Sequence, residues 1–174
     1  MADFDEIDPT MVESDLHEIR GALLNDTIAV LGPAEPVCLR ESATVQEAIE
    51  RMLAHRQAGV LVTDADGRLA GIFTERDVLT RVAGQGRDPR LTALGAVMTR
   101  DPEALAPGDR VAYAVHSMSV AGYRTVPLVD AERRPLGVVT VSDVIRWLAG
   151  LFPEAVLNLP PSGALKRPHA VDAG

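Results

Sequence analysis

The stretch Gly71-Ile72-Phe73-Thr74-Glu75-Arg76-Asp77 decides the fold, because its pattern returns 66 residues further on as Gly137-Val138-Val139-Thr140-Val141-Ser142-Asp143. Each copy has a glycine, a short apolar run typical of a strand, and Thr-x-x-Asp ahead of another apolar pair, which is typical of a helix start. We therefore predict a strand that leads directly into a helix. The first turn of such a helix presents unpaired backbone N–H groups and a positive dipole end, which suits a phosphorylated ligand.

The repeat extends well beyond these seven residues, since residues 36–84 align with 102–150 at the same shift without a gap. Positions that differ often stay apolar, as Ile49 and Val115 do. Fifteen positions carry identical residues, which in the first copy are Pro36, Leu39, Val45, Ala48, Met52, Val60, Asp64, Ala65, Arg68, Gly71, Thr74, Asp77, Val78, Ala83 and Gly84. A duplicated fold explains this agreement better than chance does.

Hydrophobic periodicity predicts an α/β fold of two pseudo-symmetric repeats, each with the order β-α-β-β-α. In the first repeat we expect a strand at 37–40, a helix from the capping box Thr44–Glu47 to about 57, strands at 59–63 and 69–73 around a glycine turn, and a helix from Thr74 to Gly84. In the second repeat we expect a strand near 103–106, a helix at 110–122, strands at 125–130 and 135–141, and a helix at 141–149.

Four segments follow from these elements: an acidic arm at 1–24, the first repeat at 25–88, the second repeat at 89–150, and a proline-containing tail at 151–174. The arm has apolar residues at near-helical spacing over Asp8 to Leu24, which predicts a short amphipathic helix. Its apolar stripe should cover either the module itself or a partner subunit. A short helical turn from Asp26 should end at Gly32-Pro33, and residues 84–89 should form a linker.

Composition excludes several classes of protein. The chain has 47% hydrophobic and 24% charged residues, as globular proteins do. Of the net charge of −8, residues 1–19 account for seven acids and no Lys or Arg, so the remainder is nearly neutral. DNA binding through a basic face has no support, and an anionic ligand is not repelled. We expect a cytoplasmic location, since no apolar run approaches about 20 residues and the N-terminus does not resemble a signal peptide.

Cysteine and histidine usage predicts no metal site. Cys38 is the single cysteine and lies in an apolar run, so we expect a buried small hydrophobic side chain. The four histidines fall in different segments without ligand spacing. We interpret Met52, Met118, Val60 and Trp147 as packing residues.

The duplicated Gly-h-h-Thr-x-x-Asp motif, in which h is apolar, resembles the cystathionine-β-synthase (CBS) domain. Further matching marks are the helix start at 44–48, the strands ending in Asp64 and Asp130, and Val97-Met98-Thr99. The resemblance covers roughly residues 25–150. CBS domains normally occur in tandem as a Bateman module, so the resemblance implies two clefts between the repeats that bind adenosine-containing ligands.

The resemblance implies specific binding residues. Asp77 and Asp143 would accept hydrogen bonds from the ribose diol, and two carboxylate oxygens suit two vicinal hydroxyls. Phosphate would be met by Thr74, Arg76, Thr140, Ser142 and Arg124. The alternative for the Thr-x-x-Asp residues is simple helix capping, which duplication would copy as well. The adenine slot would be lined by Val37, Cys38, Val60, Tyr123, Thr125, Val126 and Pro127.

The two sites are not equivalent in sequence. The first repeat has Ala58 and Leu61 where the second has Arg124 and Pro127, so we expect the second repeat to hold the better adenosine slot. The favoured hypothesis is a non-enzymatic sensor that binds AMP, ADP, ATP, S-adenosylmethionine or NADH, forms a homodimer and signals to an effector protein. The alternative is a ligand-free dimerising adaptor. An enzyme would need a nucleophile with its base, which the sequence does not offer.

Overall fold

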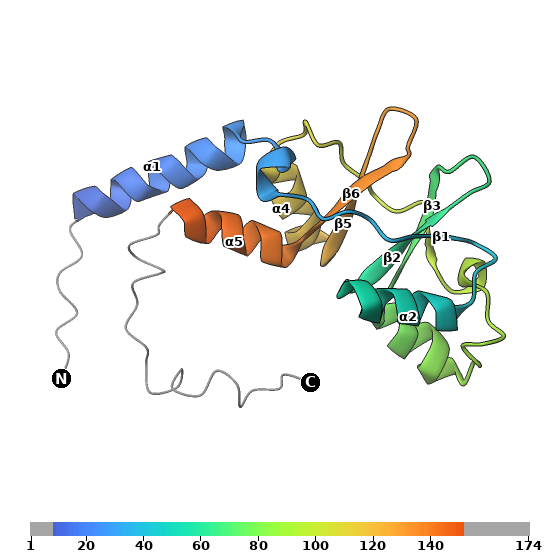
Figure 1. Ribbon diagram of the computed structural model, residues 1–174. Helices are drawn as coiled ribbons and strands as arrows, with labels where there is room; N and C mark the ends of the chain where they lie inside the picture. Colours follow the sequence, from blue (N-terminus) through green and yellow to red (C-terminus); the bar gives the residue numbers. More distant parts are fainter. Residues whose placement is uncertain (1–8, 152–174) are drawn as a thin grey trace, which may run out of the picture.

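The computed structural model describes residues 9–151, and its elements follow the duplicated pattern (Figure 1). Helix α1 (Pro9–Asn25) and the 3-10 turn η1 (Ile28–Leu31) come first. The first repeat contains β1 (Cys38–Arg40), α2 (Val45–His55), β2 (Gly59–Thr63), β3 (Leu69–Thr74) and a helical segment formed by α3 (Glu75–Asp77), η2 (Val78–Val82) and η3 (Ala83–Gln85). The second repeat contains η4 (Leu94–Ala96), β4 (Thr99–Arg100), α4 (Val111–Val120), β5 (Thr125–Val129), β6 (Pro135–Thr140) and α5 (Val141–Leu151). The predicted α/β fold with two repeats is confirmed.

Each repeat is built on an antiparallel hairpin. In the first, β2 and β3 pair so that Gly59 lies opposite Thr74, and Gly67 closes the turn with a φ of +80° as predicted. In the second, β5 and β6 pair so that Thr125 lies opposite Thr140. Helix α2 begins as predicted, with the Thr44 hydroxyl accepting a hydrogen bond from the Glu47 backbone N–H at 3.1 Å. The same strand end therefore leads into a helix in both repeats.

The strand predicted at 103–106 is wrong. Of these residues only Leu105 pairs, in an isolated parallel bridge with Leu128, at the place where Leu39 pairs with Val62 in the first repeat. There β1 is fixed by the Leu61 N–H, which donates to the Val37 carbonyl at 2.8 Å. Pro127 stands in the place of Leu61 and has no N–H to donate, so the second repeat lacks this bond.

The opening segment of each repeat, residues 27–34 in the first and 93–100 in the second (the lead-in segments), crosses over to the opposite repeat. The first pairs with repeat two through Thr27–Arg110 and Ala34–Val138, and the second pairs with repeat one through Ala93–Thr44 and the β4–β3 ladder. Their apolar side chains follow the same exchange, with Ile28 and Leu31 in the core of repeat two and Leu94, Val97 and Met98 in the core of repeat one. Each repeat is therefore completed by the lead-in segment of the other.

The glycine of each motif permits this crossing. A Cβ on Gly71 would meet the Met98 sulfur and would lie 2.9 Å from the Thr99 carbonyl oxygen. A Cβ on Gly137 would lie 3.2 Å from the Cβ of Pro33 and 3.3 Å from the Ala34 carbonyl oxygen. The lead-in segments thus approach the hairpins at positions where a side chain would collide, at Gly71, or be crowded, at Gly137.

Three apolar clusters hold the described residues together. Two of them lie inside the repeats, and Phe73 and Val139 occupy equivalent, fully buried positions in them. The third lies between the hairpins of the two repeats and contains Leu61, Leu69, Ile72, Val129 and Val138. The packing role predicted for Met52, Val60, Met118 and Trp147 is confirmed, since all four belong to these clusters or pack against them.

Helix α1 confirms the predicted helix of the arm and lies against α4 and α5 of the second repeat (Figure 1). Leu23 packs on the second core cluster, and just beyond the helix Asp26 accepts a hydrogen bond from the Trp147 indole N–H at 3.2 Å. The C-terminal end of the arm helix therefore packs on its own module, while Leu16 and Leu24 stay exposed. Residues before Pro9 and the predicted tail beyond Leu151 lie outside the described part. Between Pro9 and Leu151, no helix has the length and apolarity that crossing a membrane requires.

Candidate functional site

The motif threonine and aspartate form the same contact at the start of both second helices. The backbone N–H and the hydroxyl of Thr74 donate to Oδ2 of Asp77 at 2.9 and 2.8 Å. The corresponding groups of Thr140 donate to Oδ2 of Asp143 at 2.8 and 2.7 Å. Both aspartates therefore cap their helices, as the Thr-x-x-Asp pattern predicts, and the contact fixes the orientation of each carboxylate.

The second oxygen of each carboxylate is paired with an arginine that the sequence analysis did not single out. Arg81 Nε lies 3.2 Å from Oδ1 of Asp77, and Arg146 Nη1 lies 2.9 Å from Oδ1 of Asp143. The aspartate side chains are only 11% and 13% exposed. The sequence did contain a signal for these two ion pairs, because an acid and a base three or four residues apart on a helix face each other.

The two arginines occupy different positions relative to their aspartates, since Arg81 follows Asp77 by four residues and Arg146 follows Asp143 by three. After Asp77 the chain makes a π-helical turn over η2, whereas α5 is α-helical throughout. A π-helical turn holds more residues than an α-helical one. Both spacings place an acid and a base on one face of a helix, so each arginine reaches the free Oδ1 although the two helices are wound differently.

The neighbouring strand ends bring further predicted residues to each helix start. The N–H of Glu75 donates to the Ala58 carbonyl at 3.0 Å, and the N–H of Val141 donates to the Arg124 carbonyl at 3.1 Å. Arg124 thus lies directly beside the Thr140 helix start, with Thr125 opposite Thr140 in the hairpin. Arg76, Ser142, Tyr123 and Arg124 are all exposed.

Several residues predicted to line an adenine slot are buried in the protein. Val60 is fully buried in the first core cluster, and Val126 is 1% exposed. Pro127 is buried in β5, and Val37 packs against the first cluster. A ligand at these positions would meet backbone groups rather than these side chains.

The prediction that Cys38 is buried is wrong, since the residue is exposed. Strand β1 lies at the edge of its sheet, and its side chains alternate so that Leu39 packs inward while Cys38 and Arg40 face outward. The thiol points toward the Pro36 carbonyl oxygen, 3.9 Å from the sulfur. Partial burial of the sulfur raises the pKa of the Cys38 thiol.

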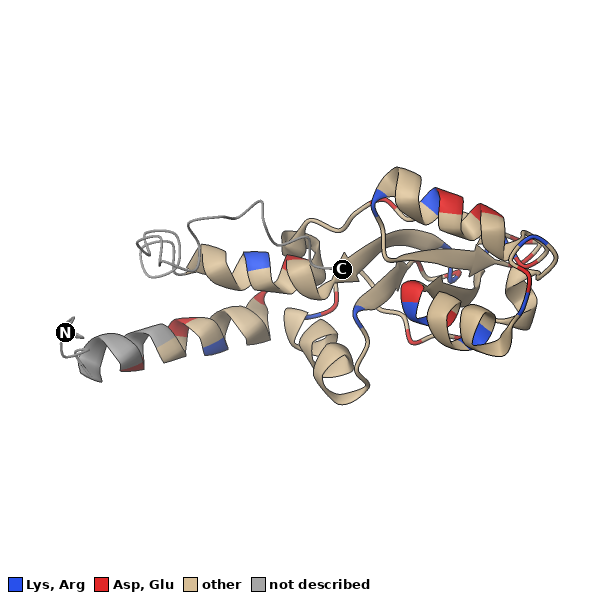
Figure 2. Ribbon diagram, turned by 90° about the horizontal axis from the view of Figure 1, so that it is seen from below, with Lys and Arg blue, Asp and Glu red and all other residues tan. Residues whose placement is uncertain are grey.

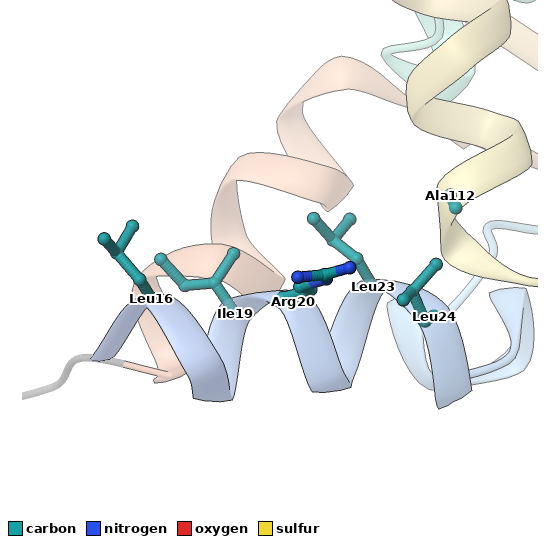
Figure 3. A pocket seen from close by; sticks show the side chains of 6 residues that line it. All are labelled: Leu16, Ile19, Arg20, Leu23, Leu24 and Ala112. Carbon is teal, nitrogen blue, oxygen red and sulfur yellow. The ribbon is translucent and has the colours of Figure 1, made fainter. Parts of the chain in front are cut away.

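Two surface hollows lie away from the motif aspartates. One, of about 560 Å³, is lined by residues at the end of β1 and the start of α2, among them Arg40, Ser42 and Glu47. The other, of about 570 Å³, runs along α1 where it faces α4, and Figure 3 shows the apolar side chains that line it. Neither hollow is lined by the motif residues.

Figure 2 shows charged residues of both signs spread over the described part of the chain, with uncharged stretches between them. In the part of the chain that the structure describes, no group of three or more His, Cys, Asp or Glu side chains is arranged to hold a metal ion. The candidate site therefore consists of the two helix starts with their capped aspartates and the strand ends beside them.

Comparison with known proteins identifies the family. The family model of the CBS domain matches residues 33–84 and 94–150. The chain belongs to the CBS domain family. Each of the two matched ranges contains its own complete copy of the Thr-x-x-Asp motif. Each helix start described above therefore belongs to a CBS domain.

Relatives of known sequence and structure agree with this assignment. The CBS domain-containing protein CBSCBSPB2 of Arabidopsis thaliana is 34% identical over 122 residues, which are 70% of this chain but only 22% of that protein. The structure of ATU1752 from Agrobacterium tumefaciens is 31% identical, covers 66% of this chain and 89% of that one, and superposes with a TM-score of 0.58. The CBS domain pair of protein MJ0100, in complex with 5-methylthioadenosine and S-adenosyl-L-methionine, is 24% identical with a TM-score of 0.65, covering 72% and 97% of the two chains.

Proposed function

We propose that this CBS pair is a sensor module that binds adenosine-containing ligands and passes its occupancy to an effector protein. The observation that carries the proposal is the Thr–Asp contact at two helix starts, which holds a largely covered carboxylate in one orientation beside a strand end in each repeat. The MJ0100 pair, which shares the fold, holds two adenosine derivatives. The chain spans only 22% of its Arabidopsis relative, so the activity of that whole protein is not part of this proposal.

In this proposal the residues divide the ligand between them. Asp77 and Asp143 take the ribose diol, and the first helical turns take phosphate through Thr74, Thr140, Arg76, Ser142 and the neighbouring Arg124. The adenine lies against the strand ends that contain Val37, Cys38, Val60, Tyr123, Thr125, Val126 and Pro127. The role is binding rather than catalysis, and the cytoplasmic location remains a prediction from the sequence.

Thermal unfolding with AMP, ADP, ATP, S-adenosylmethionine and NADH tests the proposal. A ligand that binds only the folded protein stabilises it by RT ln(1 + [L]/Kd), about 2.7 kcal/mol at a hundredfold excess over Kd. We expect at least one of the five to raise the melting temperature at millimolar concentration. If none does, the adaptor hypothesis becomes the better one.

Titration calorimetry on aspartate variants tests the assigned residues. We expect Asp143→Ala to weaken the tight binding event more than Asp77→Ala does, because the second repeat has Arg124 beside its helix start. Loss of a hydrogen-bond acceptor should reduce affinity by about tenfold to a hundredfold. Asp130→Ala is the matched control, since Asp130 caps the turn at the far end of the β5–β6 hairpin. Equal and negligible effects in folded variants would mean that both motif aspartates are caps only.

The adaptor hypothesis has its own supporting observation. Leu79 and Ile145 occupy equivalent positions on the second helices and are 68% and 60% exposed. Apolar residues at such positions are available to a second copy or to a partner protein. A dimer that binds none of the five ligands would favour this hypothesis over the sensor.

A further inference from the structure

We propose that Arg81 and Arg146, here called the competing arginines, lower the affinity for the ligand. Each guanidinium contacts a carboxylate oxygen, Oδ1 of Asp77 or Asp143, that the ribose hydroxyls need as an acceptor. This inference rests on the proposed function, because it concerns the same two aspartates. Each competing arginine contacts Oδ1, the oxygen that the threonine cap leaves free. A ribose diol must displace the guanidinium before both of its hydroxyls can be accepted.

The acceptor capacity of each carboxylate supports this reading. An ionised carboxylate has about four lone-pair positions, two on each oxygen. In Asp143 both positions of Oδ2 are taken by the N–H and hydroxyl of Thr140. The two positions of Oδ1 remain, which would suit two vicinal hydroxyls, but Arg146 Nη1 takes one of them at 2.9 Å. In Asp77 the N–H and hydroxyl of Thr74 likewise take Oδ2, and Arg81 lies 3.2 Å from Oδ1 as an ion pair without a hydrogen bond.

Duplication does not explain the two arginine contacts. The cap residues of the two repeats align with one another, whereas Arg81 aligns with Trp147 and Arg146 aligns with Thr80. The same oxygen is nevertheless contacted in both repeats, through a π-helical turn in one and an α-helical turn in the other. The contact is therefore a separate feature of each repeat, which distinguishes it from the copied caps.

The two arginines differ in their exposure and in their further partners. The Arg81 side chain is 44% exposed, and its Nη1 also donates to the Val97 carbonyl at 2.9 Å. Val97 belongs to the buried core of the first repeat, so Arg81 is held at two points. Arg146 is 72% exposed, and Asp143 is the partner that the structure gives it. Arg146 should yield to a ligand more readily, which agrees with a better adenosine site in the second repeat.

Adenosine is the probe that separates competition from phosphate binding, because it carries a ribose but no charge. Exposed arginine–carboxylate pairs are weak, so we expect Arg146→Gln to tighten adenosine binding by about twofold to fivefold in titration calorimetry. Arg81→Gln should do the same for the other site, with thermal unfolding to confirm that the variant is folded. Arg68→Gln is the matched control, since it removes an exposed Arg–Asp pair far from the motif aspartates in the first hairpin turn.

The dependence of adenosine affinity on salt concentration is a readout that a purely structural role of the two arginines would not alter. Screening weakens exposed ion pairs, so adenosine binding to the unmodified protein should tighten between low and moderate salt. A double variant with Arg81→Gln and Arg146→Gln should lose this salt dependence.

The outcomes distinguish the inference from the function on which it rests. If the unmodified protein binds adenosine and the arginine variants bind it equally well or more weakly, the competition is wrong and the sensor function stands. Binding that appears only in the arginine variants supports the competition strongly. If the proteins bind one of the five ligands named above but none binds adenosine, only this inference is overturned. If none of the proteins binds adenosine or any of the five ligands, both the sensor function and this inference are overturned.

Discussion

The motif aspartates hold the starts of their helices whether or not a ligand is present, so removing one has a cost in stability that is separate from binding. Asp77 accepts two hydrogen bonds from Thr74 and faces Arg81, and it is buried. Its loss leaves the backbone N–H of Thr74 without a partner in a half-buried place. The two roles of one carboxylate must therefore be measured separately.

We expect Asp77→Ala to lower the free energy of unfolding by about 1–2 kcal/mol, because a helix cap is lost. Asp77→Asn should cost less, since its amide oxygen can still accept from Thr74. Urea unfolding followed by far-UV circular dichroism measures both. A cost for Asp77→Asn equal to that of Asp77→Ala would mean that the charge, rather than the cap, holds this helix start.

Cys38 gives a second test at the scale of one residue. Because partial burial raises the pKa of its thiol, less thiolate is present at neutral pH than in an unfolded chain. We expect iodoacetamide to modify Cys38 more slowly in the folded protein at pH 7.5 than in urea, with the rate rising as pH passes above the ordinary thiol range. Equal rates in the folded and unfolded protein would contradict this.

The sequence predicts single residues well where local pattern decides their environment and poorly where neighbouring elements do. The caps at Thr74 and Thr140 follow from local spacing and are present. The exposure of Cys38 depends on β1 being an edge strand, which a local apolar run does not reveal. The contact of Arg81 with Asp77 has the ordinary spacing of four residues, but its second bond, to the Val97 carbonyl, comes from a distant segment that local spacing does not reveal.

At the scale of elements, the exchange of lead-in segments connects the two repeats more closely than the linker does. Strand β4 pairs with β3 at Gly71, and Ala34 pairs with Val138 next to Gly137. Periodicity correctly predicts the hairpins and helices, because each is encoded within about 20 residues. It does not predict this exchange, since pairing between distant segments leaves no local pattern.

We expect Gly71→Ala to destabilise the protein by about 1–3 kcal/mol, because the added methyl group would meet the Met98 sulfur and the Thr99 carbonyl oxygen. Gly137→Ala should cost less, since its nearest atoms are 3.2 Å away or further. Gly108→Ala is the control, because nothing lies within 4 Å of a Cβ there. Thermal and urea unfolding of the three variants would rank them, and equal stabilities would contradict the close approach.

At the scale of the whole molecule, the described residues leave apolar side chains on the outer faces of both second helices. Leu79 and Ile145 occupy equivalent positions and are exposed. Trp147, in contrast, packs against the second core cluster and donates a hydrogen bond to Asp26. Val120 adds a further exposed side chain at the end of α4. These positions lie on both repeats, as the pseudo-symmetric surface of a two-fold dimer would require.

We therefore expect a homodimer, and light scattering after size exclusion should give twice 18.6 kDa at micromolar protein. Ile145→Glu should shift the mass toward that of the monomer, because a buried charge without a partner is costly in an interface. Leu136→Glu is the matched control, since Leu136 is similarly exposed but lies at the start of β6, away from the second helices. A monomeric mass for the unmodified protein would rule the dimer out.

The exchange of lead-in segments also bears on the ancestry of the chain. A single repeat would lack Leu94 and Val97, or Ile28 and Leu31, in its core, and the edge of its hairpin would be unpaired. A second copy that contributes the same segment would complete it. We infer that an ancestor with one repeat was a pair of identical chains, each packing its first residues on the other, and that gene duplication and fusion joined two chains that were already bound.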